Sequence, residues 1–234
     1  MIALPSLFFL VADPKEAGLA PYGAEEAQVQ GAAHEPDLSQ QRPVPTGIFI
    51  LSMIALIGPS TVMQFNNQLP AYVNAAGYAL SVGTILTSLS MVGNLCGKLG
   101  VGVLTDKLGV YRAGFLVSGL IGISMILLLL RSSLAIIYVG ALLFGLSYSL
   151  NTTVPSLLYI DLYGKAAYRD PVSRQTAVSQ FIAAFLSAGF PYIYDFTGSF
   201  DPVFVYGILV CIAAAVLFLS MEKFSSGRAV QSQA

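Results

Sequence analysis

The segment Gly102 to Arg112, GVLTDKLGVYR, gathers a carboxylate and two cations between long apolar runs. Only 10% of the 234 residues are charged, so a cluster of this kind is unusual in the chain. A carboxylate such as Asp106 can pair with a guanidinium such as Arg112, and it is favoured at the positive end of a helix dipole. The segment therefore offers ion-pair chemistry at a helix end.

A second group of residues that could bind a ligand consists of polar side chains inside apolar runs. Polar side chains are costly at membrane depth, so they tend to face a bundle interior or a water-filled cavity. Each could equally bond to a neighbouring helix, which is a purely structural role. The candidates for a substrate path are Gln64, Asn67, Tyr148, Asn151, Thr152, Ser179 and Gln180, with Gln175 beside them.

The patterns of enzyme sites are absent from the sequence. The one histidine, His34, lies in a polar segment, and there is no metalloprotease, nucleophile-elbow or phosphate-loop motif. Cys96 and Cys211 lie singly in apolar runs, which favours a packing role over a metal site or a disulfide. No charged side chain lies near the middle of an apolar run, so no proton relay is evident. We predict that the chain is not an enzyme and uses no cofactor or metal.

The elements that must position these residues are transmembrane helices. The chain is 56% hydrophobic, and its apolar runs approach the roughly 20 residues that a membrane-spanning helix needs. The stretch QFNNQLPAYVNAAG is predicted to be a loop between the first two helices. The fold class is therefore all-α, a polytopic membrane protein with six helices, which we expect near 46–66, 77–98, 111–130, 134–158, 176–194 and 202–221.

Two features suggest how these helices pack. Gly58 and Pro59 lie inside the first helix, where a proline removes a backbone hydrogen bond and predicts a kink that could be functional or structural. Gly93 and Gly97 form a GxxxG pair in the second helix, and small residues at this spacing let helices approach closely.

The distribution of cations predicts the orientation. Ten of the eleven Lys and Arg residues lie in the two terminal segments and in the second and fourth connections, and Arg131 alone lies on the other side. The positive-inside rule makes the richer side cytoplasmic, with both termini inside. We expect a multi-pass protein of the cell (inner) membrane, in contact with lipid and without a nucleic-acid partner.

The ends of the chain flank the predicted bundle. Residues 1–12 look like the remnant of a preceding transmembrane helix, because they are apolar but too short to span a bilayer. Residues 13–45 are rich in charge and proline, which predicts a cytoplasmic linker. The six-helix bundle is expected over 46–221, and a cytoplasmic tail over 222–234.

The opening segment fits the pattern GxxxDxxGxxR, and it lies between the second and third helices of a six-helix unit. In this it resembles the major facilitator superfamily of transporters. The stretches FFLVADPKEAGLAPYG, VPSLLYIDLYG and PYIYDFTGSFDPVF resemble the monocarboxylate and oxalate/formate antiporter branch. The resemblance covers the whole chain and implies the C-terminal half of a twelve-helix transporter, present as a truncated piece whose partner is an N-terminal half or a second copy.

The resemblance also implies roles for residues. The substrate path would be lined by the first, second, fourth and fifth helices, and the two halves would rock to give alternating access. Gly102 would allow close packing of the second helix against the fifth, and Gly109 belongs to the same gating motif. Asp106 would sit at a helix N-terminus near Arg112 and latch the cytoplasmic side. The alternative is a topogenic loop whose cations merely stay inside.

The function implied is secondary active or facilitative transport of a small solute, most simply a monocarboxylate-like anion. Oxalate-type members carry cations in the second and fifth helices, and here those helices have none in their interiors. A neutral solute, or an anion bound through the absent half, is therefore open. The alternative from another class is a non-transporting six-helix protein that acts as an assembly or regulatory partner.

Overall fold

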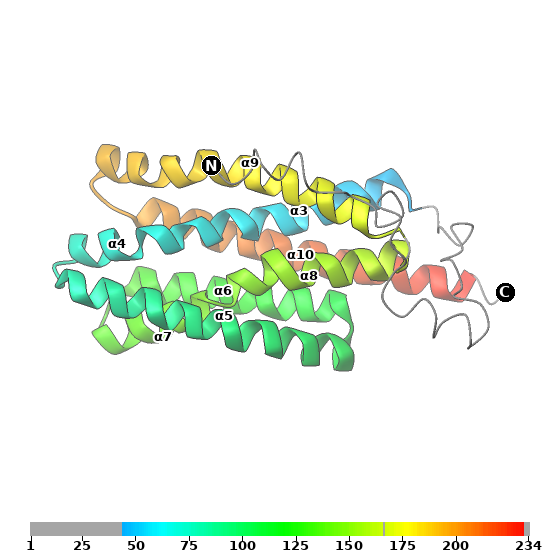
Figure 1. Cartoon of the computed structure of the whole chain (residues 1–234), viewed down its shortest axis with the longest axis horizontal. Coiled ribbons are helices and arrows are strands. Elements are labelled where there is room, and N and C mark those ends of the chain that lie inside the picture. The colour runs from blue at the N-terminus through cyan, green and yellow to red at the C-terminus, as the bar shows by residue number, and fades with distance from the viewer. Residues whose placement is uncertain (1–43, 166, 232–234) are drawn as a thin grey trace, which may run out of the picture. The chain divides into compact units, whose positions relative to one another are not determined.

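The computed structural model describes residues 44–165 and 167–231, with side chains as far as Lys223. The predicted remnant over 1–12, nearly all of the linker over 13–45, and His34 lie outside the described residues. The described part of the chain consists of helices and short connections, without a strand (Figure 1). The helices are α3 (Thr46–Met63), η2 (Gln64–Gln68), α4 (Leu69–Ala75), α5 (Leu80–Leu108), α6 (Val110–Leu130), α7 (Leu134–Phe144), α8 (Ser147–Tyr163), α9 (Arg169–Thr197) and α10 (Asp201–Gln231).

These helices form six stretches long and apolar enough to cross a membrane, which confirms the predicted fold class. The first combines α3, η2 and α4, and the fourth combines α7 and α8. The six spans are Thr46–Ala75, Leu80–Leu108, Val110–Leu130, Leu134–Tyr163, Arg169–Thr197 and Asp201–Lys223.

The predicted loop after the first helix is wrong, because residues 64–75 are helical. Pro70 lies in the first turn of α4, where its fixed backbone angle suits a helix start. Leu69 before it and Tyr72 and Val73 after it lie at helical spacing and are buried. Burial of this apolar face outweighs the polar composition of the stretch, and only residues 76–79 connect the first two spans.

The second and third spans are also longer than predicted, and the segment Gly102 to Arg112 is mostly helical. α5 continues to Leu108, and α6 begins at Val110. Gly109 alone joins them with φ +83°, a backbone conformation that glycine adopts readily. Its N–H donates to the Thr105 carbonyl at 2.9 Å and closes α5. At the C-terminal end, the predicted tail is helical as far as Gln231.

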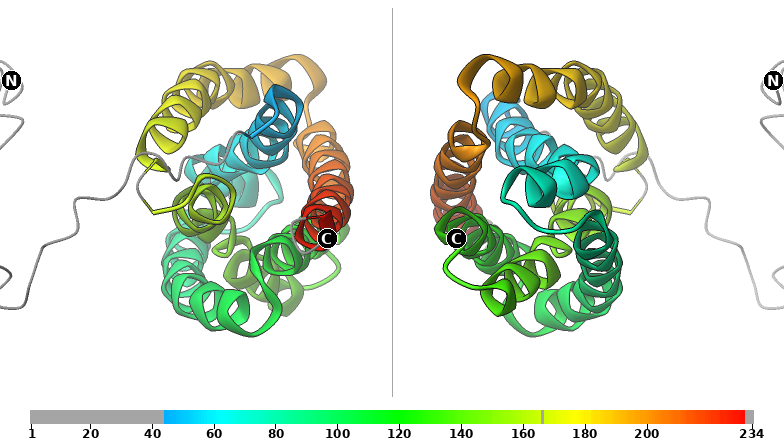
Figure 2. Two further views of the ribbon diagram at one scale, coloured as in Figure 1. Left: turned by 90° about the vertical axis from the view of Figure 1, so that its right-hand side faces the viewer. Right: turned by 90° about the vertical axis from the view of Figure 1, so that its left-hand side faces the viewer.

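The contacts between helices show which ones are neighbours in the bundle. α6 and α10 contact each other along their lengths, α3 packs against α10 and α8, and α5 packs against α4, α7, α8 and α6. α9 contacts mainly α3, η2 and α8, and the end-on views show it at the rim of the bundle (Figure 2).

Helices α5 and α9 each bury only a narrow stripe of side chains. α5 buries side chains three or four residues apart, including the predicted small residues Gly93 and Gly97. α9 buries Gln175, Ser179 and Ala183 at four-residue spacing, together with Pro171 and Phe190. Most of the surface of both helices therefore faces outward from the bundle.

An aromatic cluster around Phe65 holds the first, fourth, fifth and sixth spans together. The Phe65 ring lies 4.9 Å from that of Phe204 and 6.3 Å from those of Phe144 and Phe190, between ring centroids. Tyr72 lies 5.0 Å from Phe204 in the same edge-to-face manner. Such pairs contribute about 0.5 to 1.5 kcal/mol each beyond area burial. The cluster fixes the position of η2, on which the candidate site depends.

Candidate functional site

Two spans are interrupted at the same depth. The first changes from α-helix to 3-10 helix at Gln64–Gln68, and the fourth breaks between Phe144 and Ser147. At a rise of about 1.5 Å per residue, Asn66, Ser90 and Gly145 lie roughly 14 to 17 Å along their spans from the same end. This is near the middle of a hydrocarbon core about 30 Å thick.

Helix α5 presses against the break in the fourth span. A Cβ added to Gly93 would collide with the Leu142 carbonyl oxygen, and one added to Gly145 would collide with the Ser90 carbonyl oxygen. The Cβ at Gly145 would also lie 2.6 Å from the Asn94 backbone nitrogen. Backbone-to-backbone contact is possible here because both positions lack side chains.

Polar side chains surround this contact. The Ser90 hydroxyl lies 2.6 Å from the Asn66 Oδ1 atom and 2.8 Å from the Thr87 carbonyl oxygen. Asn66 and Ser90 are both buried. The Asn94 Oδ1 and Ser147 Oγ atoms are buried and have no hydrogen-bond partner within the described residues. We name Asn66, Ser90, Asn94 and Ser147 with the Gly93–Gly145 contact the mid-depth junction.

Candidates on the first and fourth spans are close to the junction residues in the chain. Gln64 and Tyr148 are half-buried, and Asn67 and Thr152 are exposed. The Asn151 Nδ2 group donates to the Met63 sulfur at 3.6 Å, which links α8 to α3. Thr152 donates to the Tyr148 carbonyl of its own helix at 2.8 Å.

The candidates on α9 divide between two faces. Ser179 is buried and accepts a 2.8 Å hydrogen bond from Gln175 Nε2, whereas the Gln175 Oε1 atom has no partner among the described residues. Gln180 is exposed, about 17 Å from the start of its span. The structure therefore uses Ser179 for local bonding and presents Gln180 outward.

The Gly58–Pro59 pair lies within α3, and that helix continues past it to Met63. A Cβ at Gly58 would lie 2.8 Å from the Val210 side chain, so this glycine allows α10 to pack closely against α3. The hydroxyls of Ser60 and Thr61 bond to the carbonyls of Leu56 and Gly58 at 2.6 and 2.5 Å. The change in helical form comes one turn later, at Gln64.

The proposed gating residues lie where α5 meets α6. Two expectations are corrected: Asp106 is in the last turn of α5 rather than at a helix N-terminus, and a Cβ at Gly102 would meet nothing within 4 Å. Arg112 pairs with Glu222 of α10, with Nε and Oε1 2.6 Å apart. Asp106 has no hydrogen-bond or ion-pair partner among the described residues.

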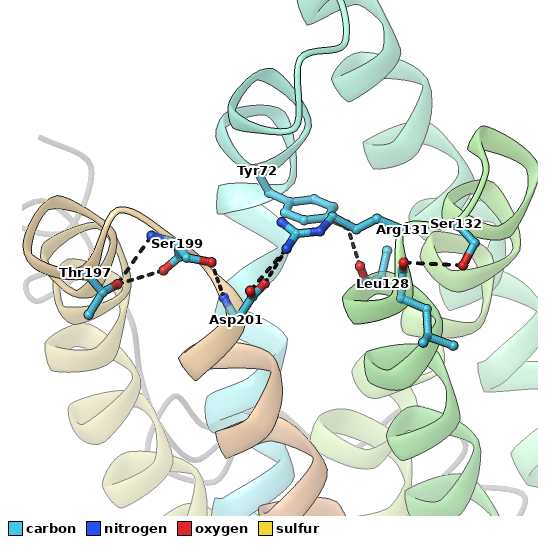
Figure 3. Close-up of polar contacts among 8 residues, drawn as sticks. Tyr72, Leu128, Arg131, Ser132, Thr197, Ser199 and Asp201 are labelled. Atoms are coloured by element: carbon cyan, nitrogen blue, oxygen red, sulfur yellow. Dashed lines mark hydrogen bonds and ion pairs between the residues drawn. The ribbon is translucent and has the colours of Figure 1, made fainter.

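Ion pairs and hydrogen bonds join the spans near both ends. Near Arg112, the Tyr111 hydroxyl donates to Asp161 at 2.8 Å and joins α6 to α8. At the opposite end, Arg131 donates to both carboxylate oxygens of Asp201 at 2.8 and 3.1 Å (Figure 3). The Tyr72 hydroxyl donates to the Leu128 carbonyl in the same region.

The sequence interpretation missed Asn66, Ser90, Asn94 and Ser147. One signal could have found Asn94: it follows Gly93 in a helix already expected to pack closely. The others need knowledge of which helices meet.

No family model matches this sequence, and no curated protein matches it. Among the described residues, no group of three or more histidine, cysteine or acidic side chains is placed to hold a metal ion. The mid-depth junction thus offers hydroxyl and amide groups for hydrogen bonding within a membrane bundle.

Proposed function

We propose that this protein transports a small solute across a cell membrane by alternating access, with the mid-depth junction as the solute site. The observation that carries the proposal is the meeting of two interrupted spans and α5 at one depth. Interrupted helices near the bilayer midplane supply backbone and side-chain groups for solute binding in many secondary transporters.

The unpartnered atoms at the junction support this proposal. Burying an amide or hydroxyl without a hydrogen bond costs about 1 to 3 kcal/mol in proteins. Asn94 Oδ1 on α5 and Ser147 Oγ on α8 bear this cost, and each residue is close in the chain to a glycine of the Gly93–Gly145 contact. A solute or a water molecule that bonded to them would remove it, which is the behaviour expected of a binding site.

The exposed polar side chains indicate a partner for the bundle. Gln180 and Asn67 are exposed within their spans and have no hydrogen-bond partner among the described residues. An unpaired amide facing lipid is unfavourable. We therefore propose that the face formed by α5, α8, α3 and α9 is covered by a second six-helix bundle, either an N-terminal half or a second copy, with water between them.

The resemblance to the major facilitator superfamily supports the same arrangement. The pattern GxxxDxxGxxR spans the α5–α6 junction, between the second and third membrane spans. We propose that the chain forms the C-terminal half of a facilitator-type transporter, with the Arg112 end of the bundle on the cytoplasmic side.

The proposed solute is a monocarboxylate-like anion. Amide and hydroxyl groups can donate to a carboxylate, but no Lys, Arg or His lies at the junction, so its charge would be balanced by the partner bundle. A neutral solute of similar size would need no such balance.

The decisive experiment measures uptake of labelled formate, lactate and glycerol into vesicles from cells that express the protein in its native genetic context. We expect saturable uptake of a monocarboxylate that falls at least tenfold in Asn94→Leu. Ser220→Ala is the control with wild-type uptake, because this hydroxyl bonds to the Val216 carbonyl of its own helix α10, outside the proposed face. Absence of saturable flux with every solute would contradict transport and favour an assembly or regulatory role.

A further inference from the structure

An apolar groove runs between α6 and α10, away from the residues of the mid-depth junction. It has a volume of about 320 Å³. Its walls include Phe115, Gly119, Gly122 and Ile126 from α6, and Cys211 and Val216 from α10. Ile126 and Val216 are 42% and 56% exposed, so the groove is open along the outer surface of the bundle.

The groove exists because α6 carries glycines on this face. A Cβ at Gly119 would meet nothing within 4 Å, so any side chain there would occupy the groove itself. A Cβ at Gly122 would lie 3.5 Å from the Cys211 side chain, which lets α10 approach. The hydroxyl of Ser118, which also lines the groove, is buried without a partner among the described residues.

The length of the groove is close to half the thickness of the hydrocarbon core. Phe115 and Ile126 are separated by about 17 Å along α6 at the usual helical rise. Half of a typical hydrocarbon core is about 15 Å. Phe115 and Ile126 lie about 8 and 24 Å from Val110 along α6, so a single acyl chain that enters from the Arg112 end and lies parallel to α6 would occupy the groove across the middle of the span.

Basic side chains lie at one end of the groove and on the same helix faces. Arg112 precedes Phe115 by three residues, and Lys223 follows Val216 by seven, both of which are same-face spacings on a helix. The Arg112 side chain is 61% exposed, and its Nε atom is held 2.6 Å from Glu222 Oε1. The two terminal guanidinium nitrogens of Arg112 have no partner among the described residues. Lys223 is exposed.

We propose that this groove binds one anionic phospholipid, with an acyl chain between α6 and α10 and the phosphate at Arg112 and Lys223. The Glu222 contact uses the Nε group of Arg112 and leaves its two terminal nitrogens for the phosphate. A guanidinium can bond to two phosphate oxygens at once, and the N-terminal end of α6 adds a favourable dipole. In the predicted orientation this is the cytoplasmic leaflet, where anionic lipids are concentrated.

Charge favours a lipid over a second copy of the chain in this groove. Two copies related by a twofold axis along the membrane normal would bring Arg112, Glu222 and Lys223 of each copy to the same end of the interface, with an excess of one positive charge per copy. Like charges that approach in this way repel one another. An anionic headgroup instead neutralises them. The proposal does not depend on the transport function.

The test is native mass spectrometry of the full chain, released from nanodiscs that contain equal amounts of phosphatidylglycerol and phosphatidylcholine. We expect one retained phosphatidylglycerol per chain. Gly119→Leu should abolish this retention because its side chain fills the groove. Gly100→Leu is the matched control, because a Cβ there also meets nothing within 4 Å and it lies on α5. Circular dichroism should show equal helicity in all three proteins.

The headgroup is tested separately with the variant Arg112→Gln/Lys223→Gln. A basic side chain near a membrane surface is worth about 1 kcal/mol, or roughly fivefold in lipid preference per charge. We expect the phosphatidylglycerol preference to fall by more than tenfold. Retention of the lipid by Gly119→Leu, an unchanged preference in the charge variant, or a cross-linked dimer through Gly119→Cys would each overturn the proposal.

Discussion

The Ser90 hydroxyl and the Asn66 Oδ1 atom lie 2.6 Å apart and join the second membrane span to the first at mid-depth. Both residues are buried, and they stand next to the place where α5 meets the broken fourth span. The polar link and the glycine contact therefore hold three spans in one arrangement.

Removal of this link should destabilise the bundle. Ser90→Ala leaves the Asn66 oxygen unpaired, and interhelical hydrogen bonds in membranes contribute about 0.6 kcal/mol on average and up to about 2 kcal/mol. We expect a loss in this range in unfolding by sodium dodecyl sulfate, followed by circular dichroism. Ser88→Ala removes a hydroxyl that bonds only to its own helix, and a loss as large as that of Ser90→Ala would contradict the role of the link.

The close approach of α5 to the fourth span should tolerate no side chain. Gly145→Ala puts a methyl group against the Ser90 carbonyl oxygen and the Asn94 backbone nitrogen. Overpacking of this kind costs about 1 to 3 kcal/mol. Gly100→Ala has open space and gains about 0.5 to 1 kcal/mol from helix propensity. Thermal unfolding in detergent should shift in opposite directions for the two variants, and a shared direction would contradict the packing.

The ion pair between Arg131 and Asp201 should contribute little. Its side chains are 37% and 43% exposed, and exposed pairs typically contribute about 0.2 to 1 kcal/mol. A double-mutant cycle with Arg131→Gln and Asp201→Asn should give a coupling energy in this range that decreases in high salt. A coupling above 2 kcal/mol would show that this end is much less hydrated than its exposure indicates.

Asp106 provides the test of gating. In an active transporter, Asp106→Asn should slow uptake several-fold while membrane insertion is unchanged, because the resemblance to the major facilitator superfamily implies a gating role for this carboxylate, which has no partner among the described residues. Lys107→Gln removes the neighbouring charge and serves as the control. Equal rates in wild type and Asp106→Asn would leave only the topogenic role of this segment.

The orientation can be measured with introduced cysteines. In a Cys96→Ser background, Lys107→Cys should react with an impermeant thiol reagent only after the membrane is opened, because that end is predicted to be cytoplasmic. Ser132→Cys, at the opposite end, should react in intact cells. The reverse pattern would overturn the predicted topology.

Composition and length were enough to predict the six spans. Twenty apolar residues can satisfy their backbone hydrogen bonds in lipid only as a helix or in a closed barrel. The secondary structure of each span therefore follows from the residues of that segment alone. The ends of the helices were less predictable. Residues 69–75 are helical because Tyr72 and Val73 are buried against other spans, and their polar neighbours suggested a loop.

The candidate site was predicted only in part. Gln64, Asn151 and Tyr148 were selected as polar residues at depth, and they lie close to the junction in the chain. Asn66 and Ser90 were not singled out, because their significance comes from contact with each other across two spans. Arg112 was expected near Asp106, but its ion-pair partner is Glu222, 110 residues away.

The sequence by itself determined that this is an all-helical membrane protein with six spans. The length of an apolar segment and the need of its backbone groups for hydrogen bonds are properties of each segment alone. It also supplied the cation asymmetry that predicts orientation. The tertiary structure decided which polar atoms meet at mid-depth and where the α6–α10 groove lies. Those features depend on helix pairing, which is set by glycine-permitted backbone contact and aromatic packing between residues far apart in the chain.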